Sequence, residues 1–84
     1  MIAQRWDQQA HAYFPYAIPA EWHSPLFCDD MNAVVNCAAC GHELPYGDCY
    51  TSLLIHNHVG MGYPVCEYCH RAEILVRMAV LEQN

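Results

Sequence analysis

The sequence predicts a small α+β domain in which a cysteine knuckle, a β-hairpin and a C-terminal helix follow an aromatic, proline-rich N-terminal arm. Three observations support this prediction. The chain has only 84 residues, and a core of that size is marginal without disulfides or a bound metal. A strand-like segment precedes the second cysteine pair, and a helix-like segment begins at that pair. Four cysteines form two C-x2-C pairs, Cys37 with Cys40 and Cys66 with Cys69.

The N-terminal arm covers residues 1–36, and we expect it to pack on the core. Residues 3–13 have a composition that allows a short helix, which Pro15 would end because proline restricts the residue before it. Further prolines divide residues 14–27 into extended pieces. The aromatic side chains of the arm either complete the core or anchor a protein interface. They are Trp6, Tyr13, Phe14, Tyr16, Trp22 and Phe27.

The metal-binding core covers residues 37–84. Residues 44–48 contain turn formers, and residues 49–59 are rich in residues that favour strands. A second turn at residues 60–64 leads to a short strand at residues 65 and 66. We therefore expect a β-hairpin between the two cysteine pairs.

The clearest helix covers residues 67–82. Glu73 and Arg77 are placed for an i,i+4 ion pair on its polar face. Small apolar residues widen the apolar surface beyond one stripe, so the helix needs two neighbours: the core, and either the arm or a second subunit in a homodimer. The residues of the stripe predicted to face the core are Ile74, Leu75, Met78 and Leu81.

The two cysteine pairs predict one structural zinc ion. Zinc takes four thiolates at tetrahedral corners, and each C-x2-C pair supplies two of them from one tight turn. Gly41 follows the first pair, where a knuckle often requires a positive φ. The second pair opens the helix, whose dipole stabilises thiolates. The predicted ligands are Cys37, Cys40, Cys66 and Cys69.

Three further residues are candidate ligands of the metal. Cys28 and Cys49 are most simply small buried apolar residues, although either could replace a predicted ligand. His42, two residues beyond the knuckle, could compete for the metal.

The order of knuckle, hairpin and helix with the second pair resembles the treble-clef class of zinc fingers over residues 36–82. The resemblance implies the architecture. It leaves the activity open, because treble clefs serve as protein adaptors, nucleic-acid binders and nuclease cores.

The histidines add a partial resemblance to zinc-containing HNH or endonuclease VII-like nucleases. The resemblance would make His56 or His58 a general base and His70 a ligand of a catalytic metal. The residues before these strand histidines are Ile55 and Asn57, where the family has a metal-binding aspartate. We therefore predict no catalytic residues, with the strand histidines in a polar edge and His70 covering the start of the helix.

The net charge of the chain narrows the kinds of partner that it can bind. Three arginines, no lysine and nine acidic residues give a net charge of -6, and nucleic-acid binding depends on Lys and Arg. The chain is thus better suited to a protein partner, such as a basic nucleic-acid-binding protein, than to nucleic acid itself.

The sequence shows neither an export signal nor an apolar run long enough to span a membrane. We expect a soluble cytoplasmic protein.

The leading hypothesis is a non-enzymatic, zinc-stabilised protein–protein interaction module that binds through its apolar helix and aromatic arm. One form of it is an acidic inhibitor of a host nucleic-acid enzyme, of the kind that phages use, whose carboxylates compete with phosphates for a basic groove. The alternatives are an HNH-like metal-dependent nuclease, degenerate or active, and a zinc-finger regulator that binds RNA polymerase.

Overall fold

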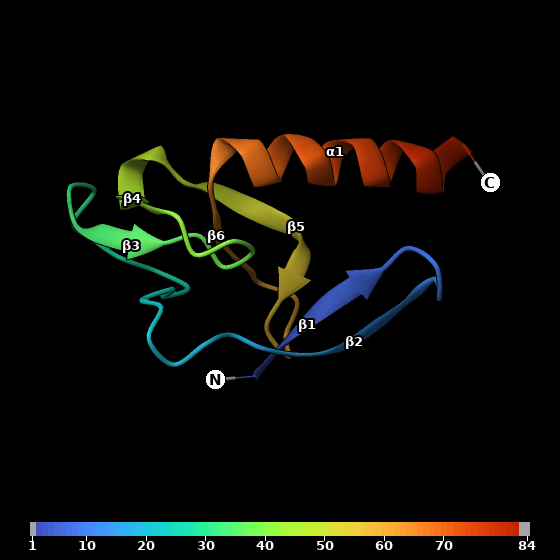
Figure 1. Ribbon diagram of the computed structural model, residues 1–84, viewed down its shortest axis with the longest axis horizontal. Coiled ribbons are helices and arrows are strands. Elements are labelled where there is room, and N and C mark those ends of the chain that lie inside the picture. The colour runs from blue at the N-terminus through green and yellow to red at the C-terminus, as the bar shows by residue number, and fades with distance from the viewer. Residues whose placement is uncertain (1, 83–84) are drawn as a thin grey trace.

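The computed structural model describes residues 2–82, and its side chains up to residue 79. A four-stranded antiparallel sheet has the order β2-β1-β5-β6, a second sheet holds β3 and β4, and α1 lies along β5 (Figure 1). The predicted α+β class is confirmed. None of the described helices is long and apolar enough to cross a membrane. The elements are β1 (Ile2–Asp7), β2 (Ala12–Ala17), β3 (Val34–Asn36), β4 (Glu43–Pro45), the 3-10 turn η1 (Tyr46–Asp48), β5 (Tyr50–His56), β6 (Gly62–Val65) and α1 (Glu67–Glu82).

The start of the arm is a β-hairpin, so the short helix predicted over residues 3–13 is wrong. β1 and β2 pair residue by residue in antiparallel register. The turn between them is closed by Asp7, whose Oδ1 accepts the backbone N–H groups of Gln9 at 2.9 Å and Ala10 at 3.2 Å. His11 completes the turn with a φ of 51°. An aspartate that binds the backbone two and three residues on favours a turn over a continuing helix.

The first strand lies inside the main sheet. β1 pairs with β2 on one side and with β5 on the other, where Gln4 lies opposite His56 and Arg5 opposite Ile55. Residues far apart in the sequence thus share one sheet. The division of the chain at residue 36 into an arm and a core stays a prediction.

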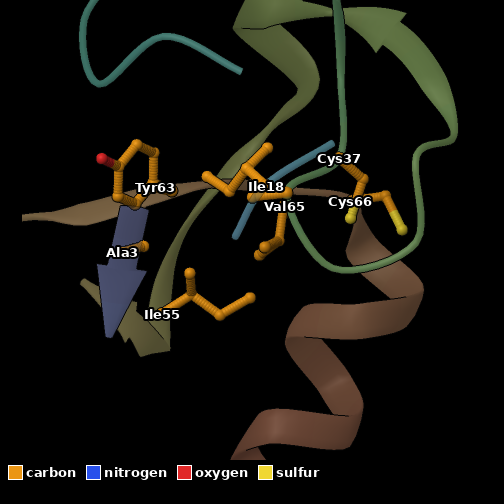
Figure 2. Packing of buried hydrophobic residues seen from close by; sticks show 8 residues of the cluster. Ala3, Ile18, Cys37, Ile55, Tyr63, Val65 and Cys66 are labelled. Carbon is orange, nitrogen blue, oxygen red and sulfur yellow. The ribbon is translucent and has the colours of Figure 1, made fainter. Parts of the chain in front are cut away.

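The hydrophobic core is small and merges with the cysteine cluster (Figure 2). Ile55 of β5 and Val65 of β6 are fully buried in one cluster with Cys37 and Cys66. Two aromatic residues of the arm pack against this core, namely Trp22 and Tyr16, whose hydroxyl donates to the carbonyl oxygen of Ala38 at 2.7 Å. The arm therefore contributes to the core. Its other aromatic residues include several exposed side chains, namely Tyr13, Phe14 and Phe27.

The helix spans the predicted residues, but the face that it turns toward β5 differs from the prediction. Ile74, Leu75 and Met78, expected in the core, are 39%, 69% and 52% exposed, and the side chain of Leu81 lies outside the described part. Glu73 is buried instead, and Cys69 and Val76 are half-buried. Together with Leu54 of β5 they line a small cavity. The cysteines explain the difference: Cys66 and Cys69 turn toward the knuckle, and residues 73 and 76 continue their face at 3-4-3 spacing.

Glu73 connects α1 to β5, so the predicted ion pair with Arg77 is wrong. Its carboxyl group, in a residue only 6% exposed, accepts the Ser52 hydroxyl at 2.5 Å and the Leu53 backbone N–H at 2.9 Å. Ser52 Oγ in turn accepts the backbone N–H of Ile55 at 2.8 Å, within an irregularity of the β5–β6 pairing. These bonds satisfy polar groups that the irregularity removes from the ladder.

Candidate metal centre

Two turns bring the four paired cysteines together. Cys37 and Cys40 lie in the turn between β3 and β4, whereas Cys66 directly precedes α1 and Cys69 lies in its first turn. Gly41 has a φ of +80°, as expected for the knuckle. Its N–H donates to the Cys37 carbonyl at 2.8 Å, which closes the first turn. A Cβ at position 41 would lie 2.5 Å from the Trp22 ring, so both the backbone and the packing require glycine.

The spacing of the sulfurs fits a metal ion. The four Sγ atoms all lie within 4.8 Å of one another, and those of Cys40 and Cys66 are 3.8 Å apart. A tetrahedron with zinc–sulfur bonds of about 2.3 Å has edges of about 3.8 Å. A disulfide needs about 2.05 Å, and all six cysteines are free thiols. This cluster could therefore hold a metal ion, and it is the one such group among the side chains that the structure describes, up to residue 79.

The electrostatics of the cluster favour a cation. Burial tends to raise the pKa of Cys37, but backbone N–H groups of Cys66, Ala39 and Cys40 outweigh it and lower that pKa. Burial and hydrogen bonds to the neighbouring cysteines raise the pKa of Cys69, and burial also raises that of Cys40. The Cys37 thiol is thus ionised more readily than usual, whereas the Cys40 and Cys69 thiols hold their protons more tightly. A divalent ion would remove the repulsion between four thiolates.

The other candidate ligands lie outside this group. The Sγ atoms of Cys28 and Cys49 contact backbone carbonyls, those of Asp30 at 3.4 Å and Pro45 at 3.7 Å, and both cysteines are only half-buried. Burial, followed by the negative charges of nearby cysteines and Asp48, raises the pKa of Cys49 to about 11. His42 contributes its carbonyl oxygen, which accepts the N–H of the first ligand cysteine at 2.8 Å.

The histidines of the nuclease resemblance do not meet. His56, at the end of β5, packs against Tyr13 with ring centroids 5.6 Å apart. His70 stacks on Tyr50 at the start of β5, with centroids 4.5 Å apart and an interplanar angle of 6°. Tyr50 and His56 are six positions apart along β5, which corresponds to about 20 Å in an extended strand. His58 is exposed in the turn beyond β5, so no base and metal ligand face each other.

Sequence reasoning missed two residues that this arrangement makes prominent. Glu73 was assigned to the polar face of the helix, and Tyr68 was given no role although it is 82% exposed beside the metal centre. Counting three and seven residues on from Cys66 and Cys69 would have found the buried face, and Tyr68 lies at the edge of that face, where it also borders the cavity beside Cys69.

Comparison with known proteins gives no relative that could assign a function. No family model matches the chain, and no similar curated protein or solved structure was found.

Proposed function

We propose that this protein is a zinc-stabilised, non-enzymatic module that binds another protein through the outer face of α1. We define the outer helix face as Tyr68, Ile74, Leu75 and Met78. Its exposure is the observation that carries the proposal, with Tyr68 82% and Leu75 69% accessible. Contiguous exposed apolar side chains of this size mark interaction sites in soluble proteins.

The outer helix face has the chemistry of an interface anchor. Tyrosine and methionine are enriched at the centres of protein interfaces, and residues 68, 75 and 78 follow one side of the helix at spacings of seven and three. A helix can present such a row to an apolar groove of its partner. Within the described part of the chain, all four side chains of this face remain exposed to solvent.

The charge of the chain favours a basic partner. Nine acidic residues against three arginines give the protein a net charge of -6, which attracts and orients a positively charged surface. Inhibition of a nucleic-acid enzyme, by competition for its basic groove, is one form of this proposal. Regulation of RNA polymerase is another.

The metal centre supports this role as a structural element. We propose that the four cysteines bind one zinc ion and that the knuckle, the β5–β6 hairpin and α1 form a treble-clef-like unit. The sulfur spacing supports zinc, and the order of the elements supports the architecture. Zinc would fix the angle of α1, and thereby the direction of the outer helix face.

Site-specific photo-crosslinking in the cells that produce the protein tests the proposal. A photo-reactive amino acid replaces Leu75 in one variant and Ile2 in the control, because these residues are 69% and 70% exposed. We expect a crosslinked partner from position 75 alone. Identical products from both positions, or none from position 75, would contradict the proposal. A product of twice the chain mass would identify a second copy as the partner.

A further inference from the structure

An open groove lies beside the metal centre. It has a cavity volume of about 870 Å³ and is lined by the knuckle, by η1 with the start of β5, and by the start of α1. Figure 1 shows η1 next to the beginning of the helix. Two of the four clustered cysteines, Cys40 and Cys66, belong to its wall. The groove and the metal centre thus have two cysteines in common.

The groove is negatively charged. Asp48 and Glu67 line it, and no lysine or arginine does. Four thiolates around one divalent ion add a charge of roughly -2. Arg71, the nearest cation in sequence, pairs with Glu67 at 2.8 Å but is 75% exposed, so this ion pair is largely solvated. The groove therefore attracts a positively charged group.

Aromatic side chains border the same groove. Tyr50 and Tyr68 line it, with 43% and 82% of their surface exposed. His70 stacks on Tyr50 at 4.5 Å and steadies its ring. Cations bind over tyrosine faces, and the planar guanidinium group of arginine can stack on a ring while its N–H groups reach carboxylates. Lysine offers a compact charge without the planar fork.

We propose that this groove binds an arginine side chain of the partner protein. The inference rests on the proposed function, because Tyr68 belongs both to the groove and to the outer helix face. A partner that lays an apolar segment along α1 can place an arginine in the groove at the same time. The outer helix face then supplies apolar contact area, and the groove supplies charge recognition.

Binding of a fluorescein-labelled oligo-arginine peptide to the zinc-loaded full chain, measured by anisotropy, tests this inference. We expect Asp48→Asn and Tyr68→Ala each to weaken binding about threefold or more. We also expect an oligo-lysine peptide of equal length to bind more weakly, and added salt to weaken both. The matched controls are Asp7→Asn, which removes the same charge from the β1–β2 turn, and Tyr13→Ala, which removes a tyrosine from β2. Zinc content is measured for every variant.

Three results would overturn the inference. They are equal losses in Asp48→Asn and Asp7→Asn, no loss in Tyr68→Ala, and equal binding of the arginine and lysine peptides. Failure of the groove can be told apart from failure of the proposed function. If the photo-reactive amino acid at position 75 captures a partner while Asp48→Asn leaves peptide binding intact, the outer helix face stands and the groove does not. The opposite pattern would leave the groove as a site without that partner.

Discussion

Replacing Glu73 tests how strongly α1 is held against the sheet. Its carboxyl group accepts the Ser52 hydroxyl at 2.5 Å and the Leu53 N–H at 2.9 Å, in a residue that is 6% exposed. In Glu73→Ala both donors lose their partner, and the Leu53 N–H is part-buried, so water can replace the lost acceptor only incompletely. Glu73→Gln retains one acceptor oxygen for two donors, so its effect is expected to be intermediate.

The magnitude follows from the number and kind of bonds lost. Hydrogen bonds to charged groups contribute about 1.5–3 kcal/mol each, and the carboxyl group no longer has to be buried once it is removed. We expect Glu73→Ala to lower the free energy of unfolding by about 3 kcal/mol. For a domain of this size, that corresponds to a melting temperature lower by roughly 10–20 °C.

Urea unfolding of the zinc-loaded variants, with the same excess of zinc in every sample, measures this effect. Equal zinc is necessary because a ligand of the native state adds to its stability by mass action. Glu67→Ala is the matched control on the same helix, since it removes an exposed ion pair with Arg71 worth about 0.3–0.5 kcal/mol. If both variants lose the same stability, Glu73 does not hold the helix in place.

Three further predictions concern the metal centre. Cys40→Ser should abolish stoichiometric zinc binding while Cys49→Ser preserves about one zinc per chain by elemental analysis, and equal loss in both would contradict the ligand set. Burial raises the pKa of the Cys40 and Cys69 thiols, so zinc must displace their protons. The affinity of the chain for zinc, measured against a competing chelator, should therefore fall as the pH is lowered. An affinity independent of pH would oppose this reasoning. Gly41→Ala places a Cβ 2.5 Å from Trp22 at a φ of +80°. We expect it to destabilise the chain by about 2 kcal/mol or more and to alter the tryptophan fluorescence. Unchanged stability and fluorescence would show that the knuckle can relax.

Local patterns predicted the C-terminal helix and the hairpin before it. The helix was predicted over residues 67–82, which are the bounds of α1, because its periodicity extends over four turns. The presence of the β5–β6 hairpin and the positive φ of Gly41 likewise follow from strand-forming residues, turn residues and a glycine after a knuckle. The strand bounds differ from the prediction, because β5 ends at His56 and β6 begins at Gly62, inside the predicted turn.

The N-terminal hairpin could not be deduced in the same way. Its position depends on the pairing of β1 with β5, about fifty residues away in the sequence, and no local pattern encodes that partner. The aspartate at position 7 was the available signal for a turn, since its side chain satisfies the backbone of the next residues.

The rotation of α1 about its own axis differs from the prediction for another reason. Hydrophobic periodicity alone favours Ile74, Leu75 and Met78 as the buried face. The clustered cysteines impose another orientation, and a serine on β5 supplies a partner for Glu73, so a carboxyl group is buried where an apolar side chain was expected.

The central place of β1 has a consequence for biosynthesis. The β1–β2 hairpin leaves the ribosome long before β5, and until then one side of β1 has unpaired backbone groups. Cys66 and Cys69 are made later still. Because the long-range pairing and the metal cluster both await these later residues, the nascent chain stays open to proteases and to wrong strand pairing until they have been made.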